Sequence, residues 1–178
     1  MAQNLVALRQ LGISHILSVL DSDLPSTFVP RVVAFVVGMQ CPDSFLQDIL
    51  IGMHISVVDD EGENLLSHFP DAFDFIHGAI EGGGRVLVHC AAGVSRSASV
   101  VISYLMKLKH IRAAEAIDMV KQVRPFINPN PGFLRQLKQY EKALSILEDS
   151  HHGNKKLGDS GGKKGILSPR RDSHAHQV

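Results

Sequence analysis

The chain has 178 residues, of which 44% are hydrophobic and 20% are charged. This length fits one globular domain, and the ordinary composition excludes a collagen-like, coiled-coil or wholly disordered protein. The 18 Lys and Arg residues balance the 18 Asp and Glu residues, so no overall charge favours nucleic acid or an anionic membrane as a partner. We therefore expect any anion-binding site to be local.

Cysteine content and apolar runs indicate the cellular environment. Only Cys41 and Cys90 are present, which is too few for a disulfide framework, and the N-terminus does not resemble a signal peptide. The longest apolar run, residues 32–39, is far shorter than the roughly 18 residues of a membrane span. We expect the protein to reside in a reducing compartment, which is the cytoplasm and could include the nucleus. We expect no membrane partner.

The first part of the chain alternates between helical and extended patterns. Residues Asn4–Leu11 are typical of a helix that ends at Gly12, and Ile13–Leu20 is typical of a strand. The apolar run at residues 32–39 is compatible with a buried strand or a short core helix. A further strand is predicted at Ile49–Val57.

The second part predicts one strand and four helices. Apolar side chains at positions 69, 73, 76 and 80 form a helical stripe, which three glycines at 82–84 end. The short β-branched run Arg85–His89 suits the centre of a parallel sheet. Helical patterns then follow, the last with Asn130 as its N-cap: Ser97–Lys109, Arg112–Val123 and Pro131–Leu147. This order predicts an α/β fold with a central, mainly parallel sheet flanked by helices.

The segment from His89 to Ser97 joins the best strand to a strong helix. A tight loop at such a junction turns successive backbone N–H groups inward, where they and the helix dipole attract an oxyanion. Arg96 adds a planar fork of donors that matches two phosphate oxygens. Cys90 faces the bound anion, and its pKa is expected to fall beside Arg96, so that it becomes a nucleophile. Gly93 can adopt a positive φ and lets the backbone approach the ligand.

Each residue of this segment also has a simpler explanation. A single cysteine at a strand end is more often a small buried hydrophobic residue, and a single arginine after a loop is usually solvated. The whole combination, however, is expected by chance in well under about one chain in a thousand at average composition. We therefore favour the functional interpretation of the segment.

The pattern His89-Cys90-x5-Arg96-Ser97 resembles the signature of the cysteine-dependent protein-tyrosine phosphatases. Residues 91–99 resemble the dual-specificity branch in particular, and the similarity extends from about Leu8 to Leu147. Residues 124–137 resemble the stretch that packs behind the phosphate loop in that branch, and residues 59–69 resemble its general-acid loop. The resemblance implies hydrolysis of phosphate monoesters through a phosphocysteine intermediate, with no cofactor and no metal.

The resemblance also implies the roles of individual residues. Cys90 would attack phosphorus, and Ser97 would hydrogen-bond its sulfur; Ser97 could also be simply a helix cap, and both roles can hold together. Arg96 and the loop residues would bind the phosphate: Ala91, Ala92, Gly93, Val94 and Ser95. His89 is expected to hold the loop rather than to carry a proton, and Asn130 to brace it by hydrogen bonding.

The general acid is one of two adjacent aspartates, Asp59 and Asp60. Neighbouring side chains in an extended segment point to opposite sides, so only one can face the phosphate. We favour Asp59, because its position resembles that of the family's acid and it directly follows the apolar pair Val57-Val58.

The loop composition indicates the substrate class. Phosphoinositide phosphatases of the superfamily tend to carry lysines in the loop, whereas the loop residues here before Arg96 are uncharged. A phosphoprotein substrate is expected, with phosphotyrosine and phosphoserine or phosphothreonine both accepted in a shallow site. The alternatives are a catalytically impaired phosphoprotein-binding module, an RNA 5′-triphosphatase and a phosphoinositide phosphatase. The oligomeric state is left open.

The composition, which shifts abruptly at His151, and comparison with the family's usual organisation predict three further features. The catalytic domain should span residues 1–150, followed by a disordered basic tail at 151–178. Residues 21–50 are longer than the usual connection and are interpreted as an insertion or a variant segment. We expect the usual N-terminal strand pair to be missing, which would leave an edge of the sheet missing or exposed.

Overall fold

The computed structural model describes residues 7–21, 34–38 and 50–153. Their strands form one sheet in the order β2-β4-β1-β3. β1 pairs in parallel with both β3 and β4, whereas β2 pairs antiparallel with β4. The predicted α/β fold with a mainly parallel sheet is thus confirmed. The strands are β1 (His15–Leu20), β2 (Ala34–Gly38), β3 (Ile51–Ser56) and β4 (Arg85–His89).

The strand β2 falls within the segment that was interpreted as an insertion. The apolar run at residues 32–39 is therefore a strand at Ala34–Gly38 and not a helix. It pairs with β4 on the side away from β1, so β4 is an inner strand and the edges of the described sheet are β2 and β3. The other residues of the expected insertion, 22–33 and 39–49, lie outside the described residues, as do Cys41 and residues 154–178 of the expected tail.

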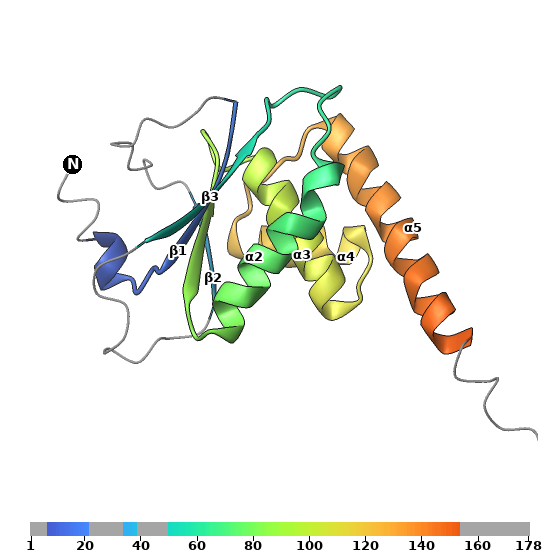
Figure 1. Ribbon diagram of the computed structural model, residues 1–178. Coiled ribbons are helices and arrows are strands. Elements are labelled where there is room, and N and C mark those ends of the chain that lie inside the picture. Colours follow the sequence, from blue (N-terminus) through green and yellow to red (C-terminus); the bar gives the residue numbers. More distant parts are fainter. Residues whose placement is uncertain (1–6, 22–33, 39–49, 154–178) are drawn as a thin grey trace, which may run out of the picture.

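The helices that follow β3 lie on one side of the sheet, as Figure 1 shows; the first and second long ones contact the strands, and the last two pack mainly on other helices. The three predicted after β4 are confirmed, with boundaries that move by one residue at the start of two of them. The last extends six residues beyond its predicted end. No helix in the described ranges is long and apolar enough to cross a bilayer. The helices are α2 (Phe69–Glu81), preceded by the short 3-10 helix η1 (Leu66–His68), α3 (Arg96–Lys109), α4 (Ala113–Val123) and α5 (Pro131–Gly153).

The main core lies between the sheet and these helices. Side chains alternate across each strand, so Leu17 and Val88 point to the helices and are completely buried there. They pack with Phe69 and Ile76 of α2 and with Ile102 of α3. A smaller cluster of Leu8, Ile13 and Leu87 belongs to the opposite face of the sheet, near the short N-terminal helical turn.

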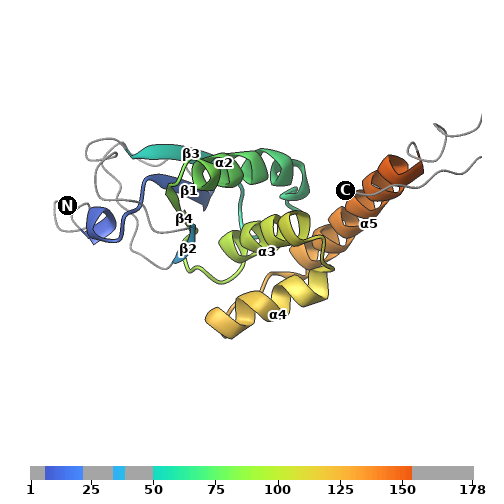
Figure 2. The same cartoon turned by 90° about the horizontal axis from the view of Figure 1, so that it is seen from below.

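α3 occupies the centre of the helical layer, between α2 and α4 (Figure 2). Its serines satisfy their hydroxyl groups within the helix, because Ser99 and Ser103 donate to the carbonyls of Ser95 and Val100. Small, internally satisfied side chains let a helix lie deep in a core without unpaired polar groups. The loop that joins β4 to the first turn of α3 is therefore held at the carboxyl ends of the parallel strands.

Candidate active site

The loop of residues 90–95, called here the phosphate loop, connects β4 to α3. Gly93 has a φ of 64°, in the left-handed region that residues with a Cβ rarely adopt. This confirms the positive φ expected at that position. The side chains of Ala91, Ala92 and Val94 are uncharged, and both alanines are exposed, so the loop offers backbone groups rather than charge.

Cys90 lies at the base of the phosphate loop and is only 4% exposed. Its Sγ atom is 3.2 Å from the Ser97 hydroxyl oxygen and accepts a hydrogen bond of 3.2 Å from the Gly93 N–H. Burial by itself raises the pKa of the Cys90 thiol. Hydrogen bonds from the Ser97 hydroxyl, the Ser97 backbone and the Gly93 backbone, together with the charge of Arg96, outweigh burial and lower the pKa. The surroundings of Cys90 therefore favour a thiolate.

Arg96 is the first residue of α3 and is 7% exposed. One guanidinium nitrogen, Nη1, donates a hydrogen bond of 3.1 Å to the carbonyl of Val57. The Nε atom is buried and has no hydrogen-bond partner among the described residues. The nearby carboxylates of Asp21 and Asp59 stand 3.8 and 3.9 Å from the guanidinium. A buried donor without a partner is costly, which fits a group that completes its hydrogen bonds with a bound anion.

The two adjacent aspartates have different surroundings. Asp59 Oδ1 accepts hydrogen bonds from the Ser95 hydroxyl at 2.7 Å and from the Asn130 side-chain amide at 2.9 Å. Asp60 instead accepts a hydrogen bond from the Gly62 N–H and so closes an exposed turn. Of the two, Asp59 is the one in contact with the phosphate loop.

The connection between α4 and α5, residues 124–130, braces the phosphate loop at three successive residues. Arg124 Nε donates to the carbonyl of Gly93 at 3.0 Å, and the Asn128 N–H donates to the carbonyl of Val94 at 2.9 Å. The Asn130 N–H donates to the Ser95 hydroxyl oxygen at 3.1 Å. Asn130 is also the N-cap of α5, since its Oδ1 accepts from the Phe133 N–H. Both expected roles of Asn130 are therefore present together.

The first turns of α5 hold the segment that follows Asp59. The Gln136 side chain accepts hydrogen bonds from the N–H groups of Leu65 and Leu66 and donates to the carbonyl of Glu63. The backbone of Glu61 lies so close to Gly132 that a Cβ atom at this position would overlap its carbonyl group. α5 thus positions the proposed general-acid loop.

His89 lies below the phosphate loop and is 1% exposed. Its Nε2 atom is 2.7 Å from the Ser18 hydroxyl oxygen of β1, and its ring also hydrogen-bonds the backbone of Cys90. Burial lowers the pKa of His89, and the nearby His54 lowers it further, against the opposite effect of the Cys90 hydrogen bond. His89 is therefore a neutral connector between β1 and the residue that bears the thiol.

Some contacts differ from the sequence interpretation or were missed by it. The alternative that Ser97 caps α3 is wrong, because the helix begins at Arg96 with Ser95 as its N-cap. The Val57 carbonyl and Asp21 were missed as neighbours of Arg96. A backbone carbonyl has no sequence signature, and the position of Asp21 directly after a parallel strand was the available signal.

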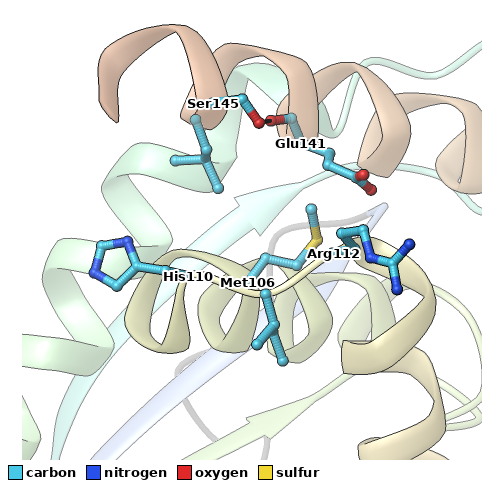
Figure 3. Close-up of a pocket in the computed structure, with 7 residues that line it drawn as sticks. Met106, His110, Arg112, Glu141 and Ser145 are labelled. Atoms are coloured by element: carbon cyan, nitrogen blue, oxygen red, sulfur yellow. Dashed lines mark hydrogen bonds between the residues drawn. The ribbon is translucent and has the colours of Figure 1, made fainter. Parts of the chain in front are cut away.

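A pocket away from the phosphate loop lies between the end of α3 and the middle of α5, with a volume of about 70 Å³ (Figure 3). None of the phosphate-loop residues lines it. The residues that line the pocket are Met106, His110, Ile111, Arg112, Glu141, Leu144 and Ser145.

Within the described ranges, no group of three or more His, Cys, Asp or Glu side chains lies close enough together to hold a metal ion.

Comparison with known proteins agrees with this geometry. The chain is 37% identical over 147 residues to dual specificity protein phosphatase 1 of Arabidopsis thaliana, an alignment covering 83% of this chain and 65% of that protein. It is 49% identical over 90 residues to dual specificity protein phosphatase 5 of Homo sapiens, covering 51% of this chain and 23% of that protein. The chain therefore spans less than two thirds of either relative.

Solved structures and family models lead to the same family. The crystal structure of human tyrosine phosphatase-like serine/threonine/tyrosine-interacting protein superposes with a TM-score of 0.66 at 32% identity, covering 82% of this chain and 87% of that one. The family model described as dual specificity phosphatase, catalytic domain, matches residues 7–143. The chain belongs to the dual specificity phosphatase catalytic domain family.

Proposed function

We propose that this chain is a protein phosphatase that hydrolyses phosphotyrosine and phosphoserine or phosphothreonine esters through a phosphocysteine at Cys90. One observation carries the proposal. A buried thiol with a lowered pKa lies beside a buried arginine whose Nε atom has no hydrogen-bond partner in the described structure. A nucleophilic sulfur and an anion-binding fork at one loop are what attack on a phosphate ester requires.

In the first step the Cys90 thiolate attacks phosphorus, and the bond between phosphorus and the leaving oxygen breaks. Asp59 donates its proton to that oxygen, so the product leaves as an alcohol or phenol. Arg96 and the backbone N–H groups of the phosphate loop stabilise the charge on the equatorial oxygens.

In the second step a water molecule attacks the phosphocysteine and transfers a proton to Asp59. The bond between phosphorus and sulfur breaks, which releases inorganic phosphate and the thiolate. Ser97, 3.2 Å from the sulfur, stabilises the thiolate as it leaves.

The side chains of the phosphate loop between Cys90 and Arg96 are uncharged, and this favours phosphoproteins as the substrates and partners of the chain. Ala91, Ala92 and Val94 provide no cation for the additional phosphates of an inositol lipid or of a 5′-triphosphorylated RNA. The similarity to a solved protein named as phosphatase-like and interacting favours one second candidate, a phosphoprotein-binding module without turnover. The chain has all three residues that the proposed reaction needs, Cys90, Arg96 and Asp59, and this favours an active phosphatase over a binding module.

An assay panel separates these functions. It contains p-nitrophenyl phosphate, phosphotyrosine and phosphothreonine peptides, phosphoinositides and 5′-triphosphorylated RNA. We expect turnover of the first three, and loss of turnover with retained phosphopeptide binding in Cys90→Ser. Arg96→Lys should also lose most activity, because lysine keeps the charge but not the bidentate geometry. Peptide binding without turnover by the wild type would show a binding module.

We also propose a catalytic domain within residues 1–150, a separate basic tail and a reducing cytoplasmic or nuclear compartment. A thiolate nucleophile supports the compartment, because it is readily oxidised elsewhere. Deletion of residues 151–178 should leave turnover of p-nitrophenyl phosphate unchanged. Imaging of a tagged full chain tests the compartment, and secretion of the active protein would contradict it.

A further inference from the structure

The α4–α5 connection carries an exposed aromatic ring next to the phosphate loop. Phe126 is 58% exposed, although the residue that follows it, Ile127, is 3% exposed and belongs to the main core. The hydrogen bonds of Arg124 and Asn128 to the phosphate loop lie on either side of Phe126 in the chain. The backbone that carries this ring is therefore anchored to the same loop that is proposed to bind phosphate.

The ring of Phe126 also has a fixed neighbour on one face. The guanidinium carbon of Arg124 lies 4.1 Å from its centroid, a cation–π contact. The Nε atom of the same guanidinium donates to Gly93 at 3.0 Å. These two contacts in series place the ring within about 10 Å of the phosphate loop, the length of about three extended residues.

Two more exposed apolar side chains belong to segments that contact the phosphate loop or its neighbours. Val123, at the end of α4, is 85% exposed, and Val58, next to Asp59, is 41% exposed. Exposed apolar groups grouped beside a binding site indicate a surface that a partner covers. The remaining large apolar residues with comparable exposure in the described structure are Leu11, Ile51 and Leu108.

We propose that Phe126, together with Val123, forms a docking surface for an apolar side chain of the phosphoprotein substrate, within three residues of the phosphorylated residue. This inference rests on the proposed function. The occupant is a substrate segment, because the surface is continuous with the phosphate loop through Arg124 and Asn128. It is an apolar side chain, because burial of the exposed ring and of the valine favours contact with apolar groups.

A scan of phosphotyrosine peptides tests this surface. Leucine, or glutamate in a parallel series, replaces alanine at one position at a time, from three residues before to three residues after the phosphotyrosine, and kcat/KM is measured for each peptide. For the wild type we expect about a five- to thirtyfold preference for leucine at one or two of these positions. The full chain and the variants Phe126→Ala and Phe126→Leu are compared.

Phe126→Ala should reduce the preference to within about twofold, and Phe126→Leu should retain most of it, since leucine keeps an apolar side chain. The matched control is Leu108→Ala, which removes another exposed apolar side chain at the far end of α3 and should keep the preference. Every protein is also assayed with p-nitrophenyl phosphate, which has no flanking residues. The preference is therefore read only from proteins that fold and turn over.

Three results would overturn the docking surface. They are a flat leucine scan for the wild type, a preference that survives in Phe126→Ala, and a stronger preference for glutamate than for leucine at the same positions. Failure of the proposed function looks different, because the wild type would then hydrolyse none of the phosphotyrosine peptides of the scan. If Phe126→Ala does not fold, Val123→Ala takes its place, and a preference that is unchanged in that variant would also overturn the docking surface.

Discussion

The hydroxyl of Ser95 donates a hydrogen bond of 2.7 Å to Oδ1 of Asp59, across 36 residues of sequence. This contact joins the segment after β3 to the phosphate loop after β4. Because both strands are parallel neighbours of β1, their carboxyl ends lie at one edge of the sheet. The parallel topology thus brings the proposed acid to the proposed nucleophile.

The first prediction concerns the proposed general acid. Asp59→Ala should lower kcat by roughly 10² to 10⁴ for a phosphotyrosine or phosphoserine ester, whose leaving oxygen must be protonated. The kcat/KM for a fluorinated phenyl phosphate, which reports only the first step, should be affected far less, because its leaving group needs little protonation. Asp60→Ala is the matched control, since Asp60 contacts the exposed turn at Gly62 instead. The assignment of Asp59 is wrong if Asp60→Ala, and not Asp59→Ala, loses much more activity with poor leaving groups than with the fluorinated phenyl phosphate.

The second prediction concerns the thiolate. Hydrogen bonds from Ser97 help to lower the pKa of Cys90, so Ser97→Ala should raise it. Because the thiolate is the reactive form, the rate of alkylation by iodoacetate should then rise at higher pH in the variant than in the wild type. Alkylation does not depend on turnover, so it reports the thiol directly. Identical pH profiles for the two proteins would show that Ser97 does not stabilise the thiolate.

The third prediction concerns the close approach of α5 to the general-acid loop. A Cβ atom in Gly132→Ala would overlap the carbonyl group of Glu61, so the loop or the helix start must move. We expect a loss of about 1–3 kcal/mol in the free energy of unfolding, together with a fall in kcat for poor leaving groups. Gly78→Ala in α2 is the control, because a Cβ there meets nothing within 4 Å. Denaturant unfolding of both variants provides the comparison, and equal stability would contradict the close approach.

The fourth prediction concerns the buried histidine. The pKa of His89 is lowered in the folded state, so protonation favours the unfolded state. The free energy of unfolding should therefore fall as the pH drops below about 6.5, the pKa of an unfolded histidine, until it reaches the lower folded-state pKa. His89→Asn should show a smaller fall over this range than the wild type, as measured by denaturant unfolding at each pH. A fall of the same size in His89→Asn would show that other groups cause it.

The sequence predicted most of the fold because the patterns were local. The apolar stripe at positions 69, 73, 76 and 80 and the short run Arg85–His89 each correspond to an observed element. The partner of β4 on its outer side could not be predicted in the same way. Antiparallel pairing of Ala34–Gly38 with β4 depends on contacts across about fifty residues, which periodicity does not encode.

The proposed site was predicted where side chains have a chemical signature. Cys90, Arg96 and Ser97 stand in one short segment, and the structure places the three together. Contacts made by the backbone carry no such signature, so the Val57 carbonyl at Arg96 was missed. Phe126 was also missed, because a single aromatic residue in a connection shows its exposure only when the chain is folded.

Trapping of the intermediate tests the central claim most directly. Wild type, Asp59→Ala and Cys90→Ser are mixed with a fluorinated phenyl phosphate, quenched within milliseconds in neutral detergent, digested and examined by mass spectrometry. The account predicts one added phosphate on the peptide that contains Cys90, accumulating in Asp59→Ala because water attack lacks its base, and none in Cys90→Ser. Turnover by the wild type without phosphate on Cys90 at any quench time, or equal turnover by Cys90→Ser, would contradict it.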